Sequence, residues 1–308
     1  MKAKQIALSL LLFTLFFASS SASAQVSTFV ASTGSDLNPC SRTAPCRNFQ
    51  AAVNVVQPGG EVVALDSAEF GSISIAKAVS VIAAPGVHAA VTATSGNGVS
   101  INAGAKDTIA LRGLTIIGHG GFAGISFSSG ETLHIESCLV SGFSGVPASV
   151  KVGVSFVGSG NLEVKDSLMR SNDVGILVKP TTGTALVTID HVRLEGGLAG
   201  LAPRGGSKVT VRHSLAADNG TGFSVGSDAA PVELTLEDCV VSNNIDGISA
   251  EGSPSGALVI VRVSNSTVTT NSNGMVNLGG AGVLSRGNNT IEGNGTDTVG
   301  VIGSYSAK

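Results

Sequence analysis

The sequence predicts an all-β fold, a right-handed parallel β-helix in which the chain winds as a solenoid, with a short capping helix at its N-terminal end. Two features of composition lead to this prediction: glycine makes up 41 of the 308 residues, and only 13% of the residues are charged. With many valine, isoleucine, serine and threonine residues, this composition is typical of short strands joined by tight turns. The third observation is a phrase of alternating apolar and polar residues that returns about every 22 to 29 residues.

The first residues have the order of a secretory signal peptide. Two lysines form a short basic start, an apolar run covers residues 6–17, and small residues follow as far as Ala24. The apolar run is shorter than the roughly 20 residues that a membrane-spanning helix needs, so no membrane span is expected. We therefore predict that residues 1–24 are a signal peptide, that residues 25–308 form one β-helix domain, and that the protein is secreted or periplasmic after cleavage near Ala24.

The segment of about residues 25–60 is expected to cover the open N-terminal end of the solenoid. Residues 48–56 are predicted to form a short helix, because Phe49, Val53 and Val56 recur on one face with helical spacing. The end of a solenoid exposes its core, so an element of this kind is needed there as a cap.

The four cysteines fall into two kinds. Cys40 and Cys46 bracket a loop that contains proline, and in an exported protein a local disulfide is the natural pairing. Cys138 and Cys239 occupy one repeat position four coils apart, which separates them by about 19 Å along the solenoid axis. Because a disulfide needs Cα atoms within roughly 7 Å, these two cysteines are predicted to be buried free thiols.

Regular coils are expected over about residues 107–300, after less regular coils upstream. Alternation within each phrase marks two strands separated by polar turns, and strands that return to one register stack in parallel about 4.8 Å apart. A propeller would need blades of roughly 40 residues or more, which these phrases are too short to form. One small or apolar residue per coil serves as an inward-facing anchor: Leu114, Cys138, Ser167, Val192, Ser214, Cys239, Ser266 and Asn288.

Two more positions recur from coil to coil. An asparagine ladder is expected at a turn, formed by Asn172, Asn219, Asn244 and Asn271. Where the backbone is expected to need a positive φ or a close approach to its neighbour, the chain has Gly175, Gly200, Gly222, Gly247 and Gly274.

The coil phrase resembles the parallel β-helix repeat of the pectin-lyase-like superfamily. The start of the mature chain, with Phe29, Asn38, Pro39 and Phe49, is similar to that of many exported bacterial β-helix proteins. The resemblance covers essentially the whole of residues 25–308 and implies the fold. It implies activity on acidic sugars more loosely, because characterised members are mostly polysaccharide lyases, hydrolases, esterases and epimerases, and one fold hosts many activities.

The catalytic patterns of that superfamily find little match in this chain. Gly118, His119 and Gly120 resemble one piece of the polygalacturonase pattern, but the sequence lacks its Asn-Thr-Asp, Asp-Asp and Arg-Ile-Lys pieces. The turns are short and tryptophan is absent, which removes the usual deep cleft and sugar-stacking platforms. The sequence therefore favours an exported protein with a non-catalytic binding or structural role at the cell surface or outside the cell, with a polysaccharide or cell-surface glycan as the expected partner. The alternative is a carbohydrate-active enzyme of the polysaccharide lyase or epimerase type that acts on acidic glycans.

No cofactor is expected. The formal net charge is −3 and no basic block stands out, which argues against nucleic acid as a partner.

Stacking the coils produces two polar columns. Two positions before the anchor, charges alternate in sign and predict a surface ladder in which opposite charges meet: Arg112, Glu136, Lys165, Asp190, Arg212 and Glu237. One position before the anchor, four consecutive coils carry the candidate site: Asp166, His191, His213 and Asp238. Histidines flanked by carboxylates either form a solvated turn of hydrogen-bonded pairs, or supply acid–base chemistry or hold a divalent metal. The sequence leaves these interpretations open and predicts no metal firmly.

Overall fold

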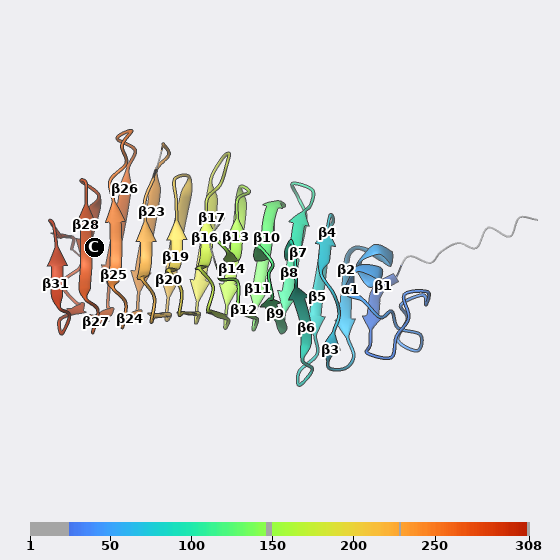
Figure 1. Ribbon diagram of the computed structural model, residues 1–308. Helices are drawn as coiled ribbons and strands as arrows, with labels where there is room; N and C mark the ends of the chain where they lie inside the picture. Colours follow the sequence, from blue (N-terminus) through green and yellow to red (C-terminus); the bar gives the residue numbers. More distant parts are fainter. Residues whose placement is uncertain (1–24, 146–149, 228, 307–308) are drawn as a thin grey trace, which may run out of the picture.

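The structure is a computed structural model that describes residues 25–145, 150–227 and 229–306. The predicted signal peptide, residues 1–24, lies outside the described residues. The described chain winds as an elongated solenoid, with β1 at one end of the body and β31 at the other (Figure 1). The predicted all-β parallel β-helix is confirmed.

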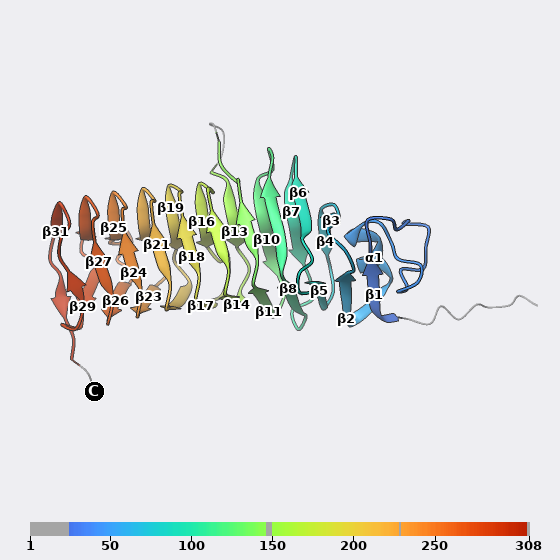
Figure 2. The same cartoon turned by 90° about the horizontal axis from the view of Figure 1, so that it is seen from below.

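Three parallel sheets form the walls of the solenoid, and neighbouring strands of each sheet come from neighbouring coils (Figures 1 and 2). Within the described residues, sheet 1 has twelve strands: β1 (Gln25–Val30), β2 (Val56–Ala64), β5 (Val79–Ala83), β8 (Thr108–Arg112), β11 (Thr132–Glu136), β14 (Gly160–Lys165), β17 (Ala185–Asp190), β20 (Ser207–Arg212), β23 (Val232–Glu237), β26 (Val259–Ser264), β29 (Gly282–Ser285) and β32 (Gly303–Ser304).

Sheets 2 and 3 have ten strands each in the part of the chain that the structure describes. Sheet 2 contains mostly short strands: β3 (Ala68–Glu69), β6 (Ala89–Ala93), β9 (Leu114–Gly118), β12 (Leu139–Ser141), β15 (Leu168–Arg170), β18 (Arg193–Glu195), β21 (Leu215–Ala217), β24 (Val240–Ser242), β27 (Thr267–Thr269) and β30 (Thr290–Ile291). Sheet 3 contains β4 (Ile73–Ile75), β7 (Asn97–Asn102), β10 (Ala123–Ser129), β13 (Val152–Phe156), β16 (Val174–Val178), β19 (Ala199–Pro203), β22 (Thr221–Val225), β25 (Asp246–Glu251), β28 (Asn273–Leu278) and β31 (Thr296–Val299).

A short helix, α1 (Phe49–Val55), lies beside β1 and β2 at the N-terminal end of the body (Figure 1). Phe49 and Val53 are buried, as is Val56, which already belongs to β2. The Phe49 ring lies 5.0 Å from that of Phe70. The helix is one residue shorter at each end than the predicted 48–56, because Asn48 is its N-cap and Val56 has extended backbone angles.

The predicted Cys40–Cys46 disulfide is present, with a Cα–Cα distance of 4.6 Å. Main-chain hydrogen bonds tie this loop to β1: the amide of Phe29 donates to Cys40, and the amide of Cys46 donates to Phe29. The disulfide therefore closes a loop that is already attached to the first strand of sheet 1.

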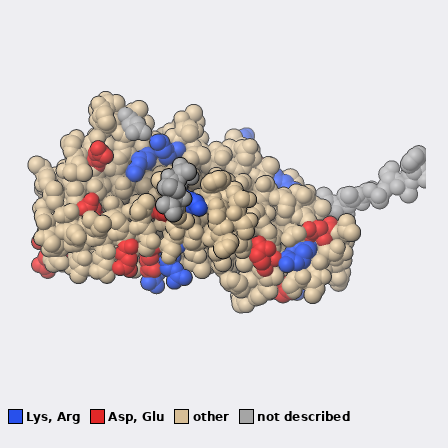
Figure 3. Space-filling view, in the orientation of Figure 1, with Lys and Arg blue, Asp and Glu red and all other residues tan. Residues whose placement is uncertain are grey.

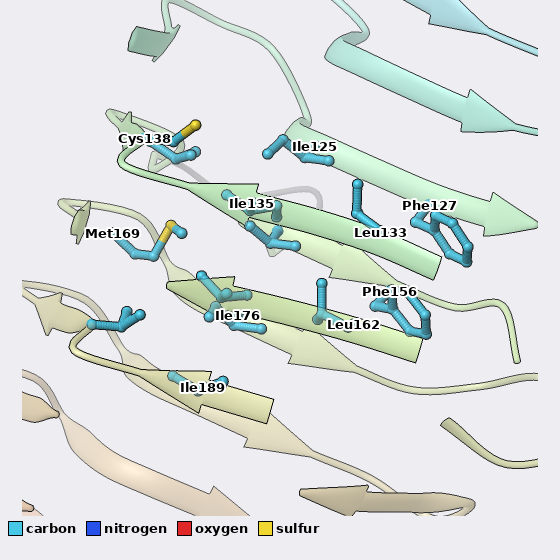
Figure 4. Packing of buried hydrophobic residues seen from close by; sticks show 14 of the residues in the cluster. Ile125, Phe127, Leu133, Ile135, Cys138, Phe156, Leu162, Met169, Ile176 and Ile189 are labelled. Atoms are coloured by element: carbon cyan, nitrogen blue, oxygen red, sulfur yellow. The ribbon is translucent and has the colours of Figure 1, made fainter. Parts of the chain in front are cut away.

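Inward side chains of successive coils stack into one continuous core. In β11 and β14, alternate residues such as Leu133 and Leu162 are buried and pair across the sheet. Phe127 and Phe156 stack with ring centroids 4.3 Å apart (Figure 4). Cys138 points into the same core (Figure 4). The period of two in the strands of sheet 1 therefore places one set of side chains in the apolar interior.

The structure confirms the predicted column of inward-facing anchor residues except for its last member. Side-chain hydroxyls link neighbouring coils there: Oγ of Ser266, for example, accepts the amide of Cys239 at 3.1 Å. The amide of Ser266 in turn donates to Oδ1 of Asn289 at 2.8 Å, and Thr267 pairs with Thr290. The last anchor is thus Asn289 rather than Asn288, because the turn before it is one residue longer than in the preceding coil.

The predicted asparagine ladder is continuous from Asn219 to Asn271, whereas Asn172 is separated from it by one coil in which Gly197 takes the position. It lies between sheets 2 and 3, and each side-chain oxygen accepts hydrogen bonds from the coil before it. Oδ1 of Asn244 accepts from the amide of Asn219 at 3.0 Å, and Oδ1 of Asn271 accepts from the amide of Asn244 at 2.9 Å. Asn294 extends the ladder by one coil, and Asp297 ends it by accepting the Asn294 amide at 3.1 Å. Buried polar groups at this turn are thereby satisfied.

The predicted column of glycines is explained by close contact between the backbones of successive coils and not by a positive φ. A Cβ on Gly222 would lie 2.6 Å from the carbonyl oxygen of Gly247, and one on Gly247 would lie 2.6 Å from that of Gly274. None of the five predicted glycines has a positive φ. Glycine is needed because the backbones of successive coils meet without room for a side chain.

Candidate functional site

The four predicted site residues occupy the sharp turn between sheets 1 and 2. Asp166, His191, His213 and Asp238 have φ values of 48°, 53°, 45° and 53°. Asn265 continues the column with φ 48°. Because aspartate, asparagine and histidine are enriched among non-glycine residues in this left-handed region, the turn geometry explains much of the column's composition.

Main-chain hydrogen bonds hold these turns in register. The amide of Asp166 donates to the carbonyl of Asp190, and the amide of His191 donates to that of Arg212, at 3.2 and 3.3 Å. The amide of His213 continues the series by donating to Glu237 at 3.2 Å. The side chains of the column are therefore carried at the coil spacing on a repeating scaffold.

The structure brings the two histidines together around a carboxylate outside the predicted column. The imidazole rings of His191 and His213 stack with centroids 4.8 Å apart and an interplanar angle of 23°. Nδ1 of His213 lies 2.8 Å from Oδ1 of Asp190, and Nδ1 of His191 lies 3.0 Å from the same oxygen. The hydrogen bond from His213, and then that from His191, lower the pKa of the Asp190 carboxyl, although burial opposes the shift.

The repeat position of Asp190 predicts a place in the charge ladder, and the residue does pair in register with Lys165 and Arg212. The alternating ladder is present at Arg112–Glu136 and Arg212–Glu237, with nitrogen–oxygen distances of 3.1 and 3.4 Å. Asp190 instead contacts the histidines. Its place at the end of β17, directly before a turn histidine, was the available signal for this role.

The two outer members of the column have separate partners. Asp238 lies beside His213, with Oδ2 3.8 Å from Nε2, and accepts a hydrogen bond from the side chain of Asn265. Asp166 lies 3.8 Å from Nζ of Lys165. The group that meets is thus Asp190, His191 and His213, with Asp238 next to it.

The histidines line a shallow, open depression of about 510 Å³. Its wall continues over sheet 2 through Arg193, Leu215 and Val240. The guanidinium of Arg193 pairs with Glu195 at 2.6 Å. The depression therefore combines imidazoles, one arginine and an apolar side.

A second depression, of about 480 Å³, lies on the same turn edge and is lined by Arg112, Glu136 and Ser137. Charged side chains of both signs lie close together along the lower edge of the body in Figure 3. A further group of Lys and Arg side chains lies above the middle of that face (Figure 3).

The arrangement of the three-residue group permits two kinds of chemistry. Imidazoles exchange protons near neutral pH, and a carboxylate that accepts Nδ1–H fixes the tautomer so that Nε2 carries the lone pair. Two imidazoles and a carboxylate are also donors for a divalent transition metal, and one donor atom from each residue lies within 4.8 Å of the others.

Comparison with known proteins identifies the family. A family model described as the right-handed β-helix region matches residues 97–296, more than half of the chain. The chain belongs to the right-handed β-helix family. No curated protein matches the sequence.

Solved structures with a similar fold include three proteins with carbohydrate names. Pectate lyase Pel9A has a TM-score of 0.63 at 17% identity, covering 86% of this chain and 78% of that chain. XylC in complex with xylose has a TM-score of 0.61 at 8% identity, covering 85% and 69%. Alginate lyase from Paenibacillus sp. str. FPU-7 has a TM-score of 0.52 at 13% identity, covering 90% and 99%. At these identities the likeness concerns the fold.

Among the described residues, no helix has the length and apolar character that crossing a membrane requires.

Proposed function

We propose that this β-helix protein acts on an acidic polysaccharide as a lyase or epimerase, with its chemistry at Asp190, His191 and His213. The observation that carries the proposal is the pair of stacked imidazoles held by one carboxylate in an open depression. The similar structures named for pectate and alginate lyases support it, because both polymers consist of uronic acids.

Lyases and epimerases of uronates share a first step, the removal of the proton next to the sugar carboxylate. A lyase then expels the glycosidic oxygen at the neighbouring carbon and leaves an unsaturated sugar, whereas an epimerase returns a proton to the opposite face. Both need a base within hydrogen-bonding reach and a positive or hydrogen-bonding group at the carboxylate.

The residues of the depression can be assigned to these roles. His191 donates Nδ1–H to Asp190, which leaves Nε2 as the base. The His191 side chain is 55% exposed. His213 has the same tautomer, and its Nε2 faces Asp238. Arg193 lies at the wall, where a guanidinium is suited to a sugar carboxylate.

Leu215 and Val240 offer an apolar side on which a sugar ring can lie. Their aliphatic surface takes the place of the aromatic platform, since the chain has no tryptophan.

A second candidate, non-catalytic glycan binding, is favoured by one observation. The depression is shallow and open and does not enclose a substrate, whereas catalytic pockets bury most of their ligand. The same groups would then hold the polymer without turning it over.

An activity assay separates these functions. Residues 25–308 would be incubated with polygalacturonate and alginate in the presence of a chelator, and unsaturated product would be followed by ultraviolet absorbance. Epimerisation would be followed by proton NMR. The enzyme proposal expects turnover that falls at least a hundredfold in His191→Asn, which keeps a side chain suited to the left-handed turn, as Asn265 does in the same column.

Asp166→Asn is the matched control, because it changes the same column outside the three-residue group. If turnover is unchanged in both His191→Asn and Asp166→Asn, the reaction does not take place at this site. Retention of polymer without turnover would establish the binding function.

We also propose that residues 1–24 direct export and are cleaved near Ala24, and that the segment of about residues 25–60 caps the solenoid. The burial of Phe49 and Val53 of α1 against the first coils supports the cap. Intact mass measurement of the exported protein tests the cleavage site.

A further inference from the structure

We propose that Asp190, His191 and His213 form a binding site for a divalent transition metal ion, with zinc as the representative ion. Among the described residues, these three form the one group of His, Cys, Asp or Glu side chains whose donor atoms converge in this way. The proposal concerns the regulation of the site and in that respect rests on the proposed function. Metal binding itself is testable without any substrate.

The two nitrogen–oxygen distances are close to those between ligands of a small four-coordinate ion. Ligand atoms at about 2.0–2.1 Å from a tetrahedral zinc are about 3.3 Å apart. The two Nδ1–Oδ1 distances are 2.8 and 3.0 Å. All three donor atoms lie within 4.8 Å of one another. Loss of the two Nδ1 protons, together with ring rotations that widen the Nδ1–Oδ1 distances slightly and bring the two imidazole nitrogens into tetrahedral spacing, would therefore convert the hydrogen-bonded group into a ligand set. The side chains of His191 and His213 are 55% and 41% exposed on this turn edge.

Three cationic side chains close to this group have other partners. Lys165, which pairs in register with Asp190, lies 3.8 Å from Asp166. Arg212, which pairs in register with Asp190, contacts Glu237 at 3.4 Å. Arg193 contacts Glu195 at 2.6 Å. The Asp190 carboxylate consequently has the imidazoles as its contacts and remains a candidate anionic ligand.

Asp238 is a positioning residue for the metal-bound state. When Nδ1 of His213 binds a metal, the proton of the neutral ring moves to Nε2, which faces Oδ2 of Asp238 at 3.8 Å. Asn265 holds this carboxylate in place. Carboxylates behind metal-binding histidines fix the tautomer and strengthen the metal site.

The ligand types select the class of ion. Two nitrogens and one carboxylate suit zinc, cobalt, nickel or copper, whereas calcium and magnesium prefer oxygen ligands throughout. Three protein ligands leave a coordination position open to water or to a carboxylate of the polymer.

Metal binding and the proposed base exclude one another. An imidazole that binds zinc through Nδ1 carries its proton on Nε2 and cannot accept the sugar proton there. Zinc occupancy is thus expected to switch off turnover, and a chelator is expected to restore it.

The test uses tag-free residues 25–308 and titrates cobalt(II) as a spectroscopic probe, followed by competition with zinc. We expect one bound ion per chain, visible bands of a nitrogen–oxygen site, and binding at least tenfold weaker in His191→Asn, His213→Asn and Asp190→Asn. Asp238→Asn is expected to weaken binding by roughly tenfold.

His134→Asn is the matched control, because His134 forms a comparable pair with Glu163 at 2.9 Å on the same sheet but contributes one histidine only. Unchanged binding in this variant supports the proposal. Equal loss in the control, or no saturable binding by the unmodified chain, overturns it. Saturable cobalt binding in a chain without turnover refutes the enzyme proposal and leaves the metal site standing. Turnover in the presence of a chelator, by a chain that does not bind cobalt, supports the enzyme proposal and refutes the metal site.

Discussion

The replacement Asn244→Ala tests how much the asparagine ladder contributes to stability. The Asn244 side chain is 4% exposed and joins three coils. Its Nδ2 donates to the carbonyl oxygens of Ala216 and Ser242 and to Oδ1 of Asn271, at 3.1, 3.0 and 2.9 Å. Its Oδ1 accepts from the amide and from Nδ2 of Asn219, at 3.0 and 3.1 Å.

The expected loss follows from these contacts. A typical hydrogen bond contributes about 1 kcal/mol net, and a buried polar group that loses its partner costs about 1–3 kcal/mol. Alanine removes all five contacts and leaves the buried amide of Asn219 without its acceptor. We therefore expect the free energy of unfolding to fall by about 3–5 kcal/mol.

Urea unfolding, followed by far-ultraviolet circular dichroism, measures this loss. Asn161→Ala is the control, because Asn161 lies on the outer face of β14 and its Nδ2 donates to Thr132 at 3.2 Å. The control is expected to lose less than about 1 kcal/mol. Equal losses in the two variants would refute the argument that the buried ladder links the coils.

Three further predictions concern packing, thiols and charge. Gly222→Ala is expected to destabilise the fold by about 1–3 kcal/mol, since its Cβ would lie 2.6 Å from a carbonyl oxygen, whereas Gly226→Ala, with nothing within 4 Å, should change the melting temperature little. Burial raises the pKa of both free thiols to about 11, so at pH 8 a thiol reagent should label the native protein far more slowly than the unfolded chain, and equal rates would contradict their burial. The hydrogen bond from Arg262 lowers the pKa of Glu233 below 4.5, so its stabilisation is present above that pH and is lost as the pH falls through the folded-state pKa. Glu233→Gln should therefore reduce stability by at most about 1 kcal/mol at pH 7, and denaturant titrations should show the difference disappearing in acid.

Much of the fold could be predicted because each coil of a solenoid repeats the same local structure. The period of two along each strand determines which side chains face inward, and the coil period determines which of them stack. Asn219 and Asn244 could be placed in one ladder for this reason. The end of the repeat was less predictable: one additional turn residue moves the last anchor from Asn288 to Asn289.

The candidate site could be predicted in part. Repeat counting aligned His191 with His213, and the two rings do stack. It also assigned Asp190 to a charge ladder with Lys165 and Arg212, with which it pairs in register. The direction of a side chain at a strand end depends on the backbone turn that follows it, and residue spacing does not encode that direction.

The sequence by itself therefore determined the parallel β-helix, its inward columns and the turn column of histidines and aspartates, because these depend on periodicity alone. Only the tertiary structure decided that Asp190 joins His191 and His213, and that Asp238 lies behind one ring. The left-handed turn and the stacking of coils place a strand-end carboxylate next to imidazoles from two coils, and such a contact exists only after the chain has wound around itself.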